Sequence, residues 1–325
     1  TRREGNVQNN DAANLVDFTL DCGIVGVDTP GEDFEALPLD SFRYFLDYPE
    51  DIHLFGATFN TQANGFIFGG EFAYRDNQPV QVDIEDVIFA AIQPAFPRNE
   101  IVVIPETLGG VPAATLTDSR TAAPDYLTAY RGGTPGEVAP NQIIRGYESM
   151  ETIQLTLTAT KIFGGQNKLF GADQIAILAE LQGIWVPNLP GLDEIQFEGP
   201  GTHTHASPGI AETGNALLLN PTQNTDGYVT ETSWGYRLTM IGQYDNFPVE
   251  GVSMRPLIVW LHDIKGVSPG LAENFLEGRQ LGIFQTDFRM GEWTLGTTYN
   301  YFGGGGDNNA FRDRDFMSVY LRYSF

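Results

Sequence analysis

The chain ends in the stretch Phe316-Met317-Ser318-Val319-Tyr320-Leu321-Arg322-Tyr323-Ser324-Phe325. Apolar and polar residues alternate in it, and a two-residue period is typical of a β-strand with two different faces. One face carries Met317, Val319, Leu321, Tyr323 and Phe325, and the other carries Ser318, Tyr320, Arg322 and Ser324. The first set suits lipid and the second suits water. The stretch therefore predicts a strand that crosses a membrane.

Alternation recurs upstream and predicts eight further strands, although it is weaker in 52–62 and less regular in 252–263 and 279–289, with a candidate tenth strand at 15–27. The eight are 293–301, 279–289, 252–263, 233–245, 175–185, 152–160, 66–75 and 52–62. Trp and Tyr gather near the strand ends, where aromatic rings mark the two membrane boundaries. We predict an aromatic girdle of Trp185, Trp234, Tyr236, Trp293 and Tyr301.

The connections between these strands alternate strictly between long and short. Going back from the C-terminus they are 303–315, 290–292, 264–278, 247–251, 188–230, 162–172, 76–145 and 63–65. Outer-membrane barrels alternate long extracellular loops with short periplasmic turns, whereas a soluble β-sandwich has no reason to keep that order. We therefore favour a porin-like transmembrane antiparallel β-barrel, with about 9–10 strands in this chain and more in the full-length protein.

The chain divides into two regions at the first clear strand. Residues 52–325 are expected to form the C-terminal strands of one barrel, with long extracellular loops at 76–145 and 188–230. Residues 1–51 are expected to form an N-terminal region in an extracellular loop. Within the first long loop, Asp83, Glu85 and Asp86 precede the apolar run 87–92, which predicts a short N-capped helix ending before Pro94.

Composition excludes several classes of protein. The 325 residues include 42 Asp and Glu against 18 Lys and Arg, a formal net charge of −24. Nucleic acid is therefore not an expected partner, because few cations are available to neutralise phosphates. A single cysteine, Cys22, rules out an intramolecular disulfide. The longest apolar run, 87–92, is far too short for a membrane helix.

A polar set on the strands would face the inside of the barrel. Its mixed charge fits a selective passage for small polar solutes or for the head group of an amphiphile. The alternative, which we favour for the set as a whole, is that these side chains pair across neighbouring strands and fill a narrow interior. The candidates are Glu71, Arg75, Gln154, Glu180, Arg237, Gln243 and Arg322.

Metal binding has only weak candidates. His203 and His205 are spaced to lie on one side of an extended chain, but a metal site needs a third ligand, so a solvated loop is favoured. Acidic residues gather on the expected extracellular side, including Asp307, Asp313 and Asp315. Such oxygen ligands suit Ca²⁺. A solubilising acidic surface is the favoured account, and no resident cofactor is expected.

An enzyme is not expected. The four histidines lie in no recognisable nucleophile motif, and the glycines of 303–306 join two strands rather than introduce a helix. A surface hydrolase stays open as a minor alternative, which would require activity that is lost on replacing His203, His205 or Asp226.

Several stretches, in order along residues 45–325, carry a family resemblance. They are Tyr48-Pro49-Glu50-Asp51-Ile52, 56–60, Gly70-Glu71 with Tyr74-Arg75, Gly171-Ala172-Asp173-Gln174 with Glu180, 198–202, Ser233-Trp234-Gly235-Tyr236-Arg237, His262-Asp263, Asn274-Phe275 with Glu277-Gly278-Arg279, Phe302-Gly303-Gly304 and Asp313-Arg314-Asp315-Phe316. Together they resemble the outer-membrane family named domain of unknown function thirteen-oh-two. The first 45 residues lie outside the resemblance.

The resemblance implies a porin-like barrel of a Gram-negative outer membrane, longer at its N-terminus than this chain, and traffic of apolar molecules through the envelope. It also implies partners: membrane lipid and lipopolysaccharide, a small hydrophobic cargo, and the barrel assembly machinery, which would read Val319, Leu321, Tyr323 and Phe325. We expect a channel or facilitator for hydrophobic or amphipathic compounds. The alternative is a closed structural or surface-binding barrel whose acidic loops contact metal ions, glycans or proteins.

Overall fold

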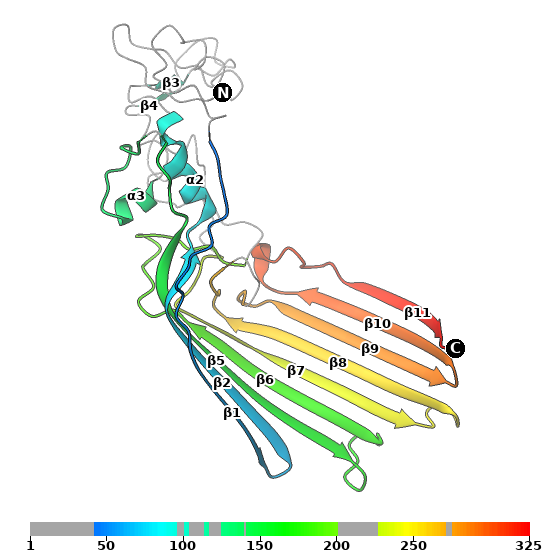
Figure 1. Ribbon diagram of the computed structural model, residues 1–325. Helices are drawn as coiled ribbons and strands as arrows, with labels where there is room; N and C mark the ends of the chain where they lie inside the picture. Colours follow the sequence, from blue (N-terminus) through cyan, green and yellow to red (C-terminus); the bar gives the residue numbers. More distant parts are fainter. Residues whose placement is uncertain are drawn as a thin grey trace, which may run out of the picture.

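Nine strands form one antiparallel sheet in the order β1-β2-β5-β6-β7-β8-β9-β10-β11 (Figure 1). The computed structural model describes residues 42–95, 101–103, 114–116, 125–139, 141–200, 227–270 and 275–325. The strands are β1 Phe55–Ala63, β2 Phe66–Gln81, β5 Tyr147–Gly164, β6 Gln174–Trp185, β7 Thr232–Asp245, β8 Val252–Lys265, β9 Gln280–Met290, β10 Trp293–Gly303 and β11 Phe316–Tyr323. The predicted all-β class is confirmed.

Short elements outside this sheet lie beyond the strand ends rather than over a face of the sheet (Figure 1). They are α2 Ile84–Ile92, η3 Gln93–Ala95, α3 Tyr126–Tyr130, η8 Gly306–Asn308, and a ribbon of β3 Ile101–Val103 and β4 Ala114–Leu116. Among the residues that the structure describes, no helix has the length and hydropathy needed to cross a membrane.

All nine predicted strands are present, with shifted ends. β1 begins at Phe55 rather than Ile52, and β2 runs past Arg75 to Gln81 after a bulge between Arg75 and Gln78. The candidate strand at 15–27 lies outside the described residues. Within the described part of the chain the sheet is open, because β1 and β11 each pair with one strand only. The structure therefore establishes the antiparallel sheet and not a closed cylinder.

Long and short connections alternate, as predicted. The segments 82–146, 186–231, 266–279 and 304–315 join strands at the upper end of the sheet in Figure 1, and 64–65, 165–173, 246–251 and 291–292 join them at the lower end. We call these the long-connection end and the short-turn end. Two of the short turns have the backbone conformation that tight β-hairpins require. Asn64 and Gly65 both have positive φ (51° and 76°), as a type I′ hairpin turn requires, and Gly291 has φ 56° at the first turn position.

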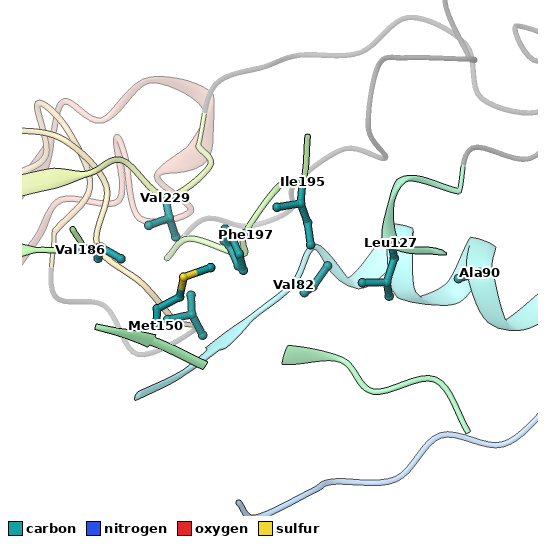
Figure 2. Packing of buried hydrophobic residues seen from close by; sticks show 9 residues of the cluster. Val82, Ala90, Leu127, Met150, Val186, Ile195, Phe197 and Val229 are labelled. Atoms are coloured by element: carbon teal, nitrogen blue, oxygen red, sulfur yellow. The ribbon is translucent and has the colours of Figure 1, made fainter. Parts of the chain in front are cut away.

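The apolar core lies at the long-connection end, not under the sheet. Figure 2 shows side chains from strand ends and from the long connections packed together. An isolated antiparallel bridge between Val82 and Phe197 joins the first long connection to the second. The cluster comprises Val80, Val82, Ala90, Leu127, Met150, Val186, Ile195, Phe197 and Val229. The two long connections therefore fold together into a cap on this end of the sheet.

Helix α2 is confirmed and ends before Pro94, and Asp83 stands at its N-cap position, but the Asp83 side chain forms no capping hydrogen bond. The carboxylate of Glu198, from the second long connection, accepts a hydrogen bond from the Ile84 N–H at 3.1 Å instead. A carboxylate at a helix N-terminus also interacts favourably with the helix dipole. A residue distant in sequence thus supplies a hydrogen-bond acceptor for the first residue of α2.

A buried ion pair fastens the third long connection. Asp263, near the end of β8, accepts hydrogen bonds from Arg279 Nε at 2.7 Å and from the Leu276 N–H at 3.0 Å. The Asp263 side chain is 2% exposed and that of Arg279 is 14% exposed. Backbone bonds from Asp263 N to Arg279 O and from Gly278 N to Asp263 O close the same unit. The segment 275–279 is therefore bound tightly to the β8 end.

The side chain of Tyr320 in β11 passes over Gly296 in β10 and reaches Asp287 in β9. Gly296 of β10 pairs with Tyr320 of β11 on one side and with Asp287 of β9 on the other. The Tyr320 hydroxyl donates to Asp287 Oδ1 at 2.7 Å, and a Cβ on Gly296 would come within 2.3 Å of the Tyr320 ring. The ring thus lies over the glycine to reach the second strand, and only glycine leaves room for it.

We predict that Gly296→Ala lowers the free energy of unfolding by about 1–3 kcal/mol, because the added methyl displaces the Tyr320 ring and breaks its bond to Asp287. Denaturant unfolding followed by tryptophan fluorescence measures the change. Gly183→Ala is the matched control, because a Cβ there meets its nearest atoms at 3.6 Å. Equal effects of the two substitutions would contradict the role given to Tyr320.

We also predict that Asp263→Asn lowers the free energy of unfolding by about 3 kcal/mol, because it removes the charge of a buried carboxylate that accepts hydrogen bonds from Arg279 and from the Leu276 N–H. The same unfolding measurement applies. Asp173→Asn is the control, because Asp173 pairs with Lys168 at the solvent-exposed short-turn end and should contribute little. A larger loss of unfolding free energy for Asp173→Asn than for Asp263→Asn would contradict the stabilising role given to the buried Asp263 carboxylate.

Candidate functional site

The strand register divides the side chains into two chemically different faces. Directly paired residues of antiparallel strands point to the same side of a sheet. The row Leu321–Leu295–Phe288–Met254 crosses β11 to β8 on one side, and the row Arg322–Thr294–Arg289–Ser253 crosses the same strands on the other. We call the side that carries Leu321 the apolar face and the side that carries Arg322 the polar face.

The apolar face is exposed and has aromatic residues at its ends. Met317, Val319 and Leu321 are 67%, 63% and 65% exposed. Trp185, Trp234, Tyr236 and Tyr301 lie on this face near the long-connection end, and Trp293 lies on it at the short-turn end. Tyr301 stacks on Trp260 at 5.7 Å, and Trp293 packs on Tyr323 at 4.9 Å. The residues proposed for the girdle therefore share one face.

The C-terminal residues proposed for assembly continue this face. Val319, Leu321 and Tyr323 lie on the edge strand β11, where they pair with Thr297, Leu295 and Trp293. Phe325 follows the strand, fully exposed, and its ring stacks on that of Tyr323 at 6.5 Å between centroids. The final aromatic residues are thus accessible beside an edge of β11 that no strand of the described residues pairs with.

The seven predicted interior residues all lie on the polar face, but the fold brings only some of them together. Glu180 and Arg237 are direct partners across β6 and β7. Gln154 of β5 pairs with Ala73 of β2, so it lies diagonally opposite both Glu71 and Arg75, which are each two residues from Ala73 along β2. Arg322 lies on the opposite edge strand. The set is therefore spread over the sheet and does not form one cluster.

Sequence reasoning missed an arginine cluster on the polar face. Arg255 pairs with Asp287, and Arg289 and Arg322 both pair with Thr294. Arg255, Arg289 and Arg322 thus occupy adjacent rows near the short-turn end, and all three are exposed. We call them the arginine band. The irregular alternation of 252–263 and 279–289 concealed it, although Asp287 and Arg289 do alternate with Phe288 and Met290.

An apolar stripe lies next to the arginine band on the same face. In the two rows beyond it toward the long-connection end, Ile241 pairs with Leu257, and Val259 pairs with Ile283. The stripe comprises Leu178, Ile241, Leu257, Val259 and Ile283, and the row that holds Glu180 and Arg237 follows it. A solute with an apolar body and an anionic group would match the apolar stripe and the adjacent arginine band.

The metal candidates do not assemble into a site among the described residues. Asp307 and Asp313 form ion pairs with Arg312 at 3.1 and 3.8 Å. Asp315 accepts hydrogen bonds from the Tyr299 hydroxyl at 2.5 Å and from the Phe302 N–H at 2.7 Å, and these bonds lower the pKa of Asp315. No group of three or more His, Cys, Asp or Glu side chains gathers within the part of the chain that the structure describes. His203 and His205 lie outside that part.

One comparison with known proteins gives a match. The model of a family described as Protein of unknown function (DUF1302) matches residues 16–325, so the match reaches further toward the N-terminus than the resemblance that began at residue 45. A search of curated proteins and a search of solved structures give no match. Because the family model spans nearly the whole chain, this protein belongs to the DUF1302 family.

Proposed function

We propose that the nine-stranded sheet is part of a β-barrel in a Gram-negative outer membrane and that the protein is a channel or facilitator for amphipathic compounds. The observation that carries the proposal is an exposed apolar face that extends over all nine strands with no second layer of the described chain against it. Monomeric soluble proteins rarely leave apolar patches larger than a few hundred Å² in water. Lipid is the solvent that such a face fits.

The position of the core supports the same proposal. In a soluble sandwich, the middle of each strand would contribute side chains to a buried layer. Among the described residues, the fully buried apolar side chains come instead from strand ends and connections, such as Val80, Val186 and Phe197. The mid-strand residues Leu238 and Leu181 are each 44% exposed. The hydrocarbon of a bilayer would replace the missing layer.

The two open edges argue for closure by further strands. An exposed β-strand edge presents unpaired N–H and C=O groups, and inside a bilayer each such group costs several kcal/mol. The described residues leave one edge of β1 and one edge of β11 without a strand. We infer that strands outside the described residues pair with both edges and complete the barrel. The short turns would then face the periplasm, and the cap would face outward.

The polar face supports a passage for amphipathic anions. Its apolar stripe offers a surface for a hydrophobic body, and the arginine band offers donors for a carboxylate or phosphate group. Both lie on the side of the sheet that a closed barrel would enclose. The rival function is a closed surface barrel, in which the same side chains pack against further strands or a plug.

We predict opposite labelling of two neighbouring residues if the sheet spans a membrane. In a Cys22→Ser background reconstituted into liposomes, Ser318→Cys should react rapidly with a water-soluble maleimide, and Val319→Cys should be shielded by lipid. Solubilisation in denaturant should make both react. Equal reactivity of both cysteines in liposomes would reject the transmembrane sheet.

We predict ion flow through the purified full-length protein in planar bilayers. Replacing Arg255, Arg289 and Arg322 by glutamine should lower the anion-to-cation permeability ratio, because the charge that attracts anions is lost. The reversal potential in a salt gradient measures this ratio. Protein that inserts but never conducts, for the native sequence and across the voltage range, would favour the closed surface barrel instead.

A further inference from the structure

One lysine interrupts the apolar face near the short-turn end. Lys161 of β5 pairs with Phe66 of β2 and with Ile177 of β6, so its side chain belongs to the apolar face. The other lysine on this face, Lys265, ends β8 at the opposite, long-connection end and pairs with Trp234. In a protein with a net charge of −24, a cation at this place needs an explanation.

The ammonium of Lys161 lies between two aromatic rings. Its Nζ is 4.1 Å from the ring centroid of Phe66 and 5.3 Å from that of Phe163. Phe66 is the first residue of β2 after the Asn64–Gly65 turn, and Phe163 is the residue before the last of β5. Both rings thus lie at the short-turn end of their strands. The charge is therefore held at the edge of the apolar face rather than in its middle.

The rings provide attraction but no negative charge. Cation–π contacts stabilise an ammonium, yet a charge on a lipid-facing surface still requires water or a counter-ion. Among the described residues Lys161 forms no ion pair with a carboxylate, although Lys168, in the adjacent turn, pairs with Asp173 at 2.6 Å. Lysine side chains at membrane edges reach toward the headgroups, where phosphates are the abundant anions.

We propose that Lys161, Phe66 and Phe163 form a binding site for the headgroup phosphate of a glycerophospholipid in the leaflet at the short-turn end. The inference rests on the proposed membrane location. The ammonium would donate to the phosphate oxygens, and the two rings would pack against the glycerol and the first methylenes of the acyl chains.

Native mass spectrometry of the delipidated full-length protein, titrated with phosphatidylglycerol, tests the proposal. The native protein and Lys161→Arg should retain one tightly bound lipid. Lys161→Gln and Lys161→Met should bind it about fivefold more weakly, the effect of one lysine at an anionic membrane surface. Lys168→Gln removes a charge from the same end of the sheet, but one already paired with Asp173, and should bind like the native protein.

Unchanged lipid affinity in Lys161→Gln and Lys161→Met would overturn the site, and so would equal weakening in Lys168→Gln. Competition by inorganic phosphate at concentrations as low as those of the lipid would also overturn it, because the site would then recognise a free anion. Incorporation of the native protein into liposomes is measured on the same preparation. Failure of that step would reject the membrane location itself, whereas incorporation with unchanged lipid binding rejects only the Lys161 site.

Discussion

Antiparallel pairing from each strand to the next is the constraint on which the rest of the structure depends. Side chains alternate along a strand, so a slip of one residue in any pairing would transfer all the side chains of that strand to the other face. Apart from one shift between β2 and β5 and one between β7 and β8, the register holds across nine strands, and it places Leu321 in line with Leu295 and Phe288, and Arg322 in line with Thr294 and Arg289. Two chemically distinct surfaces result from this register together with the alternation of apolar and polar residues along each strand. Tight turns such as Asn64–Gly65 help to fix that register.

Local periodicity made most of the sheet predictable from the sequence. Whether Leu321 or Arg322 lies on the apolar face is decided within the strand, and the alternation in 316–325, 293–301 and 233–245 is regular enough to reveal it. The order of long and short connections is also a property of the sequence. The ends of the strands were less predictable. β2 continues past Arg75 through a bulge, and no periodic signal marks an extra residue in a strand.

The cap could not be predicted because it depends on contacts between distant segments. The carboxylate of Glu198 reaches the N-terminus of α2 across 114 residues of sequence, and Val82 pairs with Phe197 over a similar separation. No feature of the sequence around Asp83 indicates that Glu198 provides an acceptor at the start of α2. The arginine band was missed for a related reason. Arg255, Arg289 and Arg322 come from three strands and become neighbours only through the register.

Separating the core from the sheet has a functional consequence. Because the cluster around Phe197 and Val82 holds the cap together at the long-connection end, the faces of the sheet need not bury side chains against another layer of the described chain. The apolar face can then stay exposed, as the proposed contact with lipid requires, and the polar face can carry the apolar stripe and the arginine band, with few packing demands on either. Substitutions at Arg255 or Leu257 should therefore change the chemistry of the polar face while leaving the cap intact. Changes at Phe197 should do the reverse, because its contacts lie in the cap and not on either face of the sheet.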